Sequence, residues 1–281
     1  PLHGQPALIP YGGTEANPDI TAYSVTNDGY LHAIDAVTGE ELFAFIPEGL
    51  LQNLDILYRN SSKNKTYGLD GSIESVVIDN NRNGIIETVD NDKVYLFFGM
   101  RRGGRNYYAM DVTNRSAPQL LWTITGGTSE PGMGDYTELG QTWSKPEISK
   151  IRIKGADQLV LWFGAGYDPV QDSTIVRNPL SDTMGRGLFL VDALTGERLF
   201  HIGTGLKADL SLADMNYSMP SDLTTGDYDA NNYLDRIYVG DMGGQIWRVD
   251  VAKGEGESDT YKDIISAGRI ADLGGDTAET N

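Results

Sequence analysis

A repeated strand-and-turn unit constrains the fold of this chain more than any other feature. Each copy begins with glycine, continues as a strand in which aromatic or aliphatic residues alternate with others, and ends in an Asp and a turn. Alternation of this kind places one set of side chains inward and the other outward, as in a half-buried strand. The copies read "GYLHAIDAVTGEELF" (29–43), "GGRNYYAMDVT" (103–113), "GLFLVDALTGERLF" (187–200) and "GGQIWRVDVAKGE" (243–255).

The turn after each strand has a physical explanation. In the Asp-x-x-Thr-Gly pattern the carboxylate can accept backbone N–H bonds within the turn, and the glycine supplies the residue with positive φ. The landmark acids are Asp35, Asp111, Asp192 and Asp250. They lie further apart than the ~40–50 residues of a minimal propeller repeat, so long loops must interrupt the array. Gly/Ser/Asn/Asp-rich segments at 48–69, 126–141, 167–185 and 204–218 fit that role.

Two further strand patterns precede each copy, and a fourth follows three of them. Four antiparallel strands joined by tight turns make one propeller blade. The predicted blades span about 5–47, 70–125, 142–203 and 219–255, and the last of these shows no convincing fourth strand. The chain is therefore predicted to be all-β, with residues 1–281 forming a single β-propeller domain or a fragment of a larger ring. Residues 47–60 are either a short loop helix or an apolar loop packed on a blade edge.

The net charge of the chain limits the classes of ligand that it is expected to bind. With 22 basic and 40 acidic side chains, the formal net charge is −18, which disfavours nucleic acid and anionic lipid and suits divalent cations. No cysteine is present, which excludes disulfides and thiolate metal sites. No apolar run is long enough for a membrane span. Because the chain opens with "PLHGQPALIP" and lacks an initial Met, we expect any export signal or anchor to lie outside it.

The stretch "DYDANNYLD" carries oxygen-bearing side chains with the spacing of a calcium loop. Calcium takes six to eight oxygen ligands, and side chains at positions 1, 3, 5 and 9 with a carbonyl at position 7 can surround one ion. The predicted ligands are Asp227, Asp229, Asn231, the carbonyl of Tyr233, and Asp235. Asn232 takes position 6, where a sharp turn favours glycine and asparagine is the next most tolerant residue.

A second stretch, "DNNRNGIIETVD" (79–90), resembles an EF-hand loop, although predicted strands and not helices lie on either side of it. Its predicted ligands are Asp79, Asn81, Asn83, the carbonyl of Ile85, Glu87 and Asp90. Only two carboxylates lie in its first nine positions, so we expect weaker binding than at 227–235 unless Asp90 joins. For both loops the alternative is an Asx-rich turn that hydrogen-bonds its own backbone. Magnesium fits less well than calcium because it demands octahedral geometry.

No catalytic motif was found, and the chain is predicted not to be an enzyme. The sequence has no G-x-S-x-G, H-E-x-x-H or P-loop pattern. Its four tryptophans, Trp122, Trp143, Trp162 and Trp247, lie in or near strand patterns and are interpreted mainly as packing between blades. A quinone-binding propeller would need a tryptophan platform and a catalytic Asp in one central pocket.

Several motifs, taken in order, resemble one known family. These are "NDGYLHAIDAVTGEELFAFIP", "GMRRGGRNYYAMDVT", "ELGQTWSKPEI" and "GDYDANNYLDRIYVGDMGGQIWRVDV". Over about residues 5–255 they are similar to the C-terminal propeller domain of the PilY/PilC proteins, which are type IV pilus biogenesis factors and tip-associated adhesins. The resemblance implies a quinoprotein-like propeller, export to the bacterial surface or pilus tip, and a calcium loop at 227–235. It also implies that calcium occupancy is tied to pilus extension against retraction, the motion that drives twitching.

The resemblance also sets the expected partners. We expect minor pilins or pilus tip proteins, and a host or surface ligand for adhesion. Two alternatives remain open: a quinoprotein-type dehydrogenase propeller, and a purely structural propeller that presents loops to a protein partner. Calcium binding and quinone-dependent turnover are the observations that separate these three functions.

Overall fold

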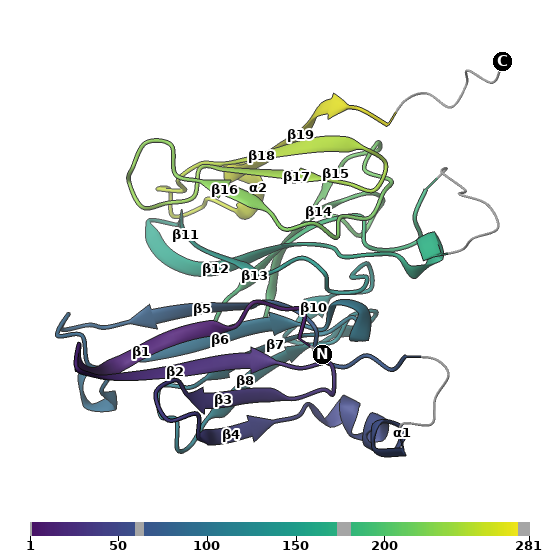
Figure 1. The fold of residues 1–281 in the computed structure, drawn as a ribbon. Helices are drawn as coiled ribbons and strands as arrows, with labels where there is room; N and C mark the ends of the chain where they lie inside the picture. Colours follow the sequence, from purple (N-terminus) through teal and green to yellow (C-terminus); the bar gives the residue numbers. More distant parts are fainter. Residues whose placement is uncertain (1, 60–64, 173–180, 275–281) are drawn as a thin grey trace. The chain divides into compact units, whose positions relative to one another are not determined.

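The computed structural model describes residues 2–59, 65–172 and 181–274. It divides the chain into two compact units, Pro1–Ile124 and Thr125–Asn281, and each is considered by itself. Both units are built almost wholly from antiparallel sheets in which consecutive strands are neighbours (Figure 1). Among the described residues, no helix has the length and apolar character needed to cross a membrane.

The first unit contains two four-stranded antiparallel sheets, each in the order of the chain. One sheet comprises β1 (Ala7–Thr14), β2 (Asn17–Val25), β3 (Leu31–Asp35) and β4 (Glu41–Phe45). The other comprises β5 (Ile73–Ile78), β6 (Lys93–Gly99), β7 (Tyr107–Asp111) and β8 (Gln119–Ile124). These eight strands lie within residues 5–47 and 70–125, the ranges given to the first two predicted blades, and β1 and β2 extend towards each other beyond the apolar stretches that predicted them.

The Asp turns form as expected from their chemistry. The Oδ1 atom of Asp35 accepts the backbone N–H groups of Val37 and Thr38, both at 2.8 Å. Gly39 follows with φ 77°, a conformation that costs glycine little. In the second unit Asp192 makes the same two bonds, to Leu194 and Thr195.

The fourth repeat departs from this pattern. Asp250 accepts hydrogen bonds from the side chains of Arg236 and Arg248.

Short helices occupy part of the connecting loops. Residues 48–59 form η1 (Glu48–Asn53) and α1 (Leu54–Arg59), which confirms the helical interpretation of 47–60. The other short helices are η2 (Thr88–Asp90), η3 (Arg101–Gly103), η4 (Pro169–Asp172) and α2 (Tyr261–Ile264). The predicted loops 48–69 and 167–185 fall partly outside the described residues.

The second unit contains a five-stranded and a four-stranded sheet, with a small two-stranded sheet beside them. The five-stranded sheet comprises β11 (Glu147–Ile153), β12 (Ala156–Gly164), β13 (Gly187–Asp192), β14 (Arg198–Gly203) and β15 (Leu210–Ser211). Strand β15 pairs in parallel with β14, so a segment predicted to be loop extends the blade by one strand. The small sheet is made by β9 (Ser129–Glu130) and β10 (Gly134–Asp135).

The last sheet comprises β16 (Thr224–Gly226), β17 (Arg236–Gly240), β18 (Gln245–Val251) and β19 (Ile265–Asp272). The expectation that the fourth blade lacks a final strand was wrong, because β19 pairs antiparallel with β18 along its length. This strand was not apparent in the sequence because its residues are mainly exposed or partly buried and because it follows a connection that holds α2. It pairs with β18 through backbone hydrogen bonds, which leave no hydrophobic period in the sequence, and Ile265 is its one buried residue.

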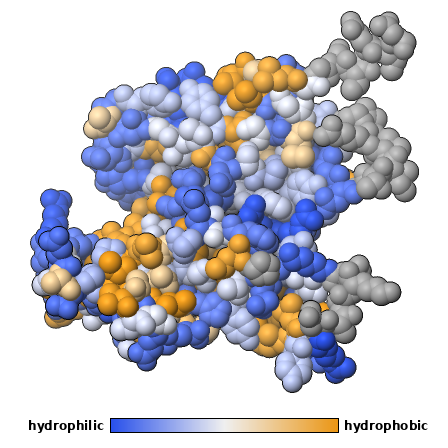
Figure 2. Space-filling model, in the orientation of Figure 1, coloured by the Kyte–Doolittle hydropathy of each residue, from blue (hydrophilic) through white to orange (hydrophobic). Residues whose placement is uncertain are grey.

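Each unit has one apolar core between its two sheets. The core of the first unit includes the buried Tyr23, Leu31, Leu96 and Phe98. The core of the second includes two of the four tryptophans, Trp162 and Trp247, which are 0% and 2% exposed. Their burial supports the packing role that the sequence indicated. On the visible face, hydrophilic side chains dominate and hydrophobic ones form separate patches (Figure 2).

Candidate metal centre

The acidic loop 227–235 joins β16 to β17, the first two strands of their sheet. Asp227 organises the loop, because its two carboxylate oxygens accept the backbone N–H groups of Asn231 (3.1 Å) and Asn232 (2.6 Å). The Asn231 side chain accepts the N–H of Tyr233 at 2.8 Å. Ala230 and Asn232 have φ values of 57° and 66°. This left-handed backbone folds the loop back on itself, so side chains at alternate positions face one region.

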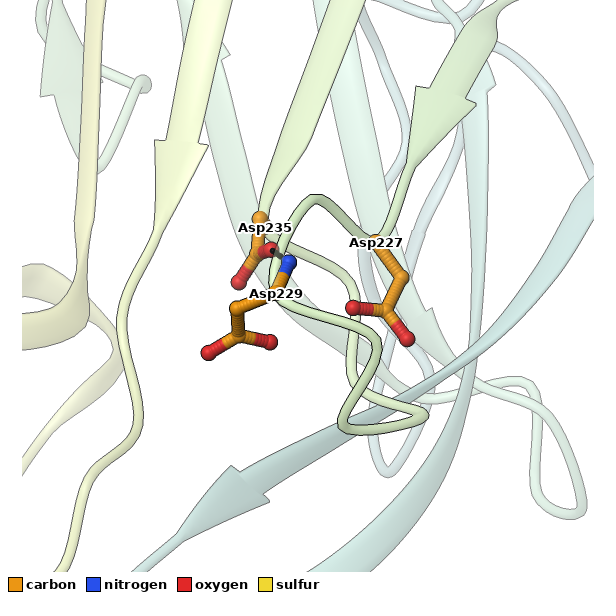
Figure 3. A group of neighbouring side chains, drawn as sticks. All are labelled: Asp227, Asp229 and Asp235. Carbon is orange, nitrogen blue, oxygen red and sulfur yellow. Dashed lines mark hydrogen bonds between the residues drawn. The ribbon is translucent and has the colours of Figure 1, made fainter.

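Three carboxylates gather on this loop (Figure 3). Asp227, Asp229 and Asp235 each offer one oxygen such that these atoms all lie within 4.8 Å of one another. Two oxygens bound to one calcium ion at ~2.3–2.6 Å can be up to ~5 Å apart, so the observed spacing fits a shared ion. Asp235 closes the loop by accepting the N–H groups of Tyr228 (2.6 Å) and Asp229 (3.3 Å).

The charge of the group also suits a cation. Partial loss of hydration opposes ionisation of Asp227, but hydrogen bonds from the N–H groups of Asn232 and Asn231 outweigh it, and the pKa of Asp227 lies below its ordinary value. Asp227 and Asp229 are exposed, and Asp235 is partly buried. Ionised carboxylates this close repel one another, and a divalent cation bound between them would relieve that repulsion.

A pocket of about 540 Å³ opens beside the loop. Asp229 and Asp235 line one part of it, and Lys262, Ile264 and Ile265 line another. The pocket is therefore formed by the acidic loop, α2 and β19, all belonging to one sheet region. A group seated there would lie next to two of the three carboxylates.

The second predicted loop, which begins at Asp79, joins β5 to β6 and repeats the same local structure. The Asp79 carboxylate accepts the N–H groups of Asn83 (3.3 Å) and Gly84 (2.8 Å), at the positions held by Asn231 and Asn232 in the first loop. Asn83 accepts the N–H of Ile85 at 2.7 Å, as Asn231 does from Tyr233. Arg82 and Gly84 have φ values of 58° and 78° and match the left-handed residues of the first loop. The two loops thus share one backbone conformation.

The loops differ at their closing acid. Position 9 is Glu87 in the second loop, and the N–H at position 2 is accepted by Asp92 instead, at 2.8 Å. Asp92 also accepts the N–H of Glu87 at 2.9 Å, and its side chain is fully buried. The EF-hand template ends at position 12, so sequence reasoning missed this residue. The only available signal was its place immediately before a strand, the place of Asp235 in the first loop.

The remaining predicted ligands of the second loop are only partly brought together. Asp90 accepts a hydrogen bond from the Asn81 side chain at 2.7 Å, which places it against the loop. In the part of the chain that the structure describes, Asp79, Glu87 and Asp90 do not form a three-carboxylate group like that of the first loop. The first loop is therefore the stronger candidate centre.

Comparison with known proteins places the chain in a family. A family model described as the PilY1 beta-propeller domain matches residues 13–272. A type IV pilus biogenesis factor PilY1 homolog of Xylella fastidiosa is 27% identical over 245 residues, which cover 87% of this chain and 17% of that protein. Type IV pilus biogenesis factor PilY1 of Pseudomonas aeruginosa is 29% identical over 246 residues, covering 84% of this chain and 17% of that protein.

A solved structure of the same family supports the fold. The crystal structure of the Pseudomonas aeruginosa PilY1 C-terminal domain aligns with a TM-score of 0.51 and 24% identity, over 83% of this chain and 39% of that one. A quinohemoprotein alcohol dehydrogenase of Comamonas testosteroni aligns with a TM-score of 0.45 and 14% identity, and no argument is based on that likeness. The chain spans 17% of the length of the curated relatives described above. With blades of antiparallel strands and a match over residues 13–272, the chain belongs to the PilY1 beta-propeller domain family.

Proposed function

We propose that this chain is the calcium-binding propeller domain of a type IV pilus-associated protein of the bacterial surface. The observation that carries the proposal is the group of three carboxylate oxygens within 4.8 Å of one another on a loop already folded by its own hydrogen bonds. A preformed oxygen cage loses less conformational entropy on binding than a disordered one, so its geometry favours useful affinity.

Each residue of the loop has a proposed role. Asp227, Asp229, Asn231 and Asp235 would contribute side-chain oxygens, and Tyr233 its backbone carbonyl. Bound calcium would supply two positive charges that neutralise the clustered acids and fix the connection between β16 and β17. We propose the loop at 79–90 as a second, weaker site because it shares the fold of the first loop but brings fewer carboxylates together.

The proposed cellular role is control of pilus extension against retraction, together with adhesion. Membership of the PilY1 family supports a role in pilus biogenesis and a location at the pilus or cell surface. The proposed partners are minor pilins or other pilus tip proteins, with a host or surface ligand for adhesion. We propose that a partner binds in the pocket beside the acidic loop, because two of the three carboxylates line it. We propose that the domain acts by binding and not by catalysis.

Titration calorimetry with Ca²⁺ tests the metal site directly. Wild-type protein stripped with a chelator should bind Ca²⁺, and Asp227→Ala and Asp235→Ala should each lower the affinity at least 100-fold, because each removes a charged ligand and a backbone acceptor. Glu257→Ala, an exposed acid outside the loop, serves as the matched control and should bind normally. Unchanged calcium affinity in both Asp variants would refute the cage.

The link to pili requires a cellular measurement. The same substitutions in the full-length protein should change the number of surface pili relative to wild type and to Glu257→Ala. Asp235→Lys should mimic the calcium-bound loop poorly or only in part, because one ammonium group replaces an ion that contacts several ligands at once. Wild-type pilus numbers in cells whose protein has lost calcium binding would disprove the coupling while leaving the metal site intact.

A further inference from the structure

The side chain of Tyr233 leaves the acidic loop and contacts the neighbouring sheet. Its hydroxyl donates to Oδ1 of Asp157 in β12 at 2.7 Å and accepts from Arg152 in β11 at 3.3 Å. The ammonium groups of Lys150 and Lys253 lie 4.3 and 5.0 Å from the centre of its ring. One aromatic side chain of the loop is thus held by four charged residues, three of which belong to the β11–β12 hairpin.

These charged residues form a network of their own. Arg152 pairs with Asp157 at 2.7 Å and with Glu255 at 2.9 Å. The Tyr233 hydroxyl, more than any other group, keeps the pKa of Asp157 below its ordinary value, and Arg152 and Lys150 add to that effect. The network is held in one arrangement, because the hydroxyl and the guanidinium both contact the same carboxylate oxygen.

The peptide bond after Tyr233 is anchored to the same hairpin. The N–H of Leu234 donates to the carbonyl of Lys150 in β11 at 3.0 Å. In a planar trans peptide the N–H and the C=O point in opposite directions. The carbonyl of Tyr233 belongs to that same peptide, so the bond from Leu234 to β11 turns it away from the hairpin. This carbonyl is the proposed ligand at position 7 of the loop.

The second loop provides an internal comparison. The N–H of Ile86 donates to the carbonyl of Tyr11 in β1, also at 3.0 Å, so the same peptide is oriented by the first strand of the preceding sheet. At position 7, however, that loop has Ile85, which is 46% exposed and has no polar group with which to hold the neighbouring sheet. The backbone hydrogen bond from position 8 to the preceding sheet is common to both loops. The side-chain clamp, by which we mean the contacts of Tyr233 with Asp157 and Arg152, is found only in the loop at 227–235.

We propose that the Tyr233 side chain is a positioning group that couples cation binding at 227–235 to the order of the β11–β12 hairpin. This inference rests on the proposed calcium site. The hairpin fixes the ring and the adjoining peptide, and the fixed peptide presents its carbonyl to the loop. By linkage, binding in the loop must order the hairpin by the same factor by which the hairpin raises the affinity of the loop.

Two tyrosine variants test the coupling. Tyr233→Phe removes the hydroxyl and keeps the ring, whereas Tyr228→Phe is the matched control in the same loop, where the tyrosine is 61% exposed. Calorimetry should show Ca²⁺ affinity reduced by roughly five- to tenfold in Tyr233→Phe, which lies within the ordinary range for the net contribution of one hydrogen bond, and unchanged in Tyr228→Phe. Asp157→Ala, in the other sheet, should reduce the affinity by a similar factor, and the double variant should lose little more.

Hydrogen exchange distinguishes coupling from a purely structural role of Tyr233, because a purely structural role would not make exchange depend on calcium. In wild type, Ca²⁺ should slow exchange of the amides of the β11–β12 hairpin, residues 150–157. That calcium-dependent slowing should vanish in Tyr233→Phe, and melting of each variant in EDTA checks that it is folded. Wild-type affinity and wild-type slowing in Tyr233→Phe would overturn the coupling alone. Absence of calcium binding by wild-type protein would instead overturn the proposed function, and this inference with it.

Discussion

The loops at 227–235 and 79–92 start with the same backbone fold and end differently. Both join the first two strands of a sheet, and in both an Asp at position 1 accepts the N–H groups of positions 5 and 6. In the first loop the acid that accepts the N–H at position 2 remains partly exposed beside two other carboxylates. In the second it is Asp92, buried and turned to the backbone. The comparison teaches that Asx hydrogen bonds shape such a loop, while the closing acid decides whether it gathers negative charge.

The largest expected effect is the loss of calcium-dependent stability from one loop only. Calcium at 100 times its dissociation constant should stabilise the folded protein by about 2.7 kcal/mol, and a chelator should remove that gain. Asp227→Ala should abolish it, whereas Asp79→Ala should leave it largely intact. Urea unfolding with and without Ca²⁺ measures both. Equal losses in the two variants would end the distinction between the loops.

The next effect separates a structural acid from a binding acid. Asp92→Asn should destabilise the metal-free protein by about 2 kcal/mol, because a buried carboxylate that accepts two N–H bonds loses its charge and one acceptor. Asp235→Asn should cost the metal-free protein less, since its carboxylate is partly exposed. Chemical unfolding in EDTA provides the measurement. A smaller loss for Asp92→Asn than for Asp235→Asn would reverse the assignment of the two closing acids.

A third substitution should make the weaker loop resemble the stronger one. Asn83→Asp adds a carboxylate at position 5 of the second loop and should raise its calcium affinity about tenfold, or ~1.4 kcal/mol, because ligand charge tunes such sites. Calorimetry of Asn83→Asp in an Asp227→Ala background isolates this loop. Failure to detect any calcium binding there would restrict the metal site to 227–235.

The smallest effect is expected for the substitution of Asn232 at position 6 of the first loop. Asn232 adopts φ 66°, where glycine would be unstrained, and Gly84 occupies the equivalent place with φ 78°. Asn232→Gly should change the stability of the metal-free protein by less than 1 kcal/mol, whereas Gly84→Val should destabilise it by about 1–2 kcal/mol. Thermal melting in EDTA checks both. Equal tolerance of the two substitutions would mean that the backbone conformations of the loops differ in solution.

Much of the fold could be predicted from the sequence because the blades repeat a local code. Alternation around Ala33 or Trp247 indicates a half-buried strand, and an Asp followed by Thr-Gly indicates the turn, since both depend on neighbours along the chain. Strand β19 and the parallel strand β15 were missed because each is joined to the strand before it by backbone pairing and shows no regular side-chain period. The first loop was predictable from spacing alone.

The side-chain clamp and the buried acid were not predictable. Tyr233 contacts Asp157 across 76 residues, and no single-sequence pattern links the two. Asp92 lies two residues beyond the 12-position EF-hand pattern that begins at Asp79. The turn that holds η2 brings its carboxylate back to the loop. In both cases tertiary structure decides the role of a residue whose type alone is uninformative.

The bonds from position 8 to the preceding sheet have a consequence for how the array folds. In a chain of repeated units, stability divides into the stability of each repeat and the coupling between nearest neighbours. The N–H groups of Leu234 and Ile86 contribute to the coupling term, because each joins one blade to the first strand of the blade before it. A loop that becomes more rigid where the two blades meet raises the cooperativity of their unfolding without changing either apolar core. Two blades that would otherwise melt separately then melt as one.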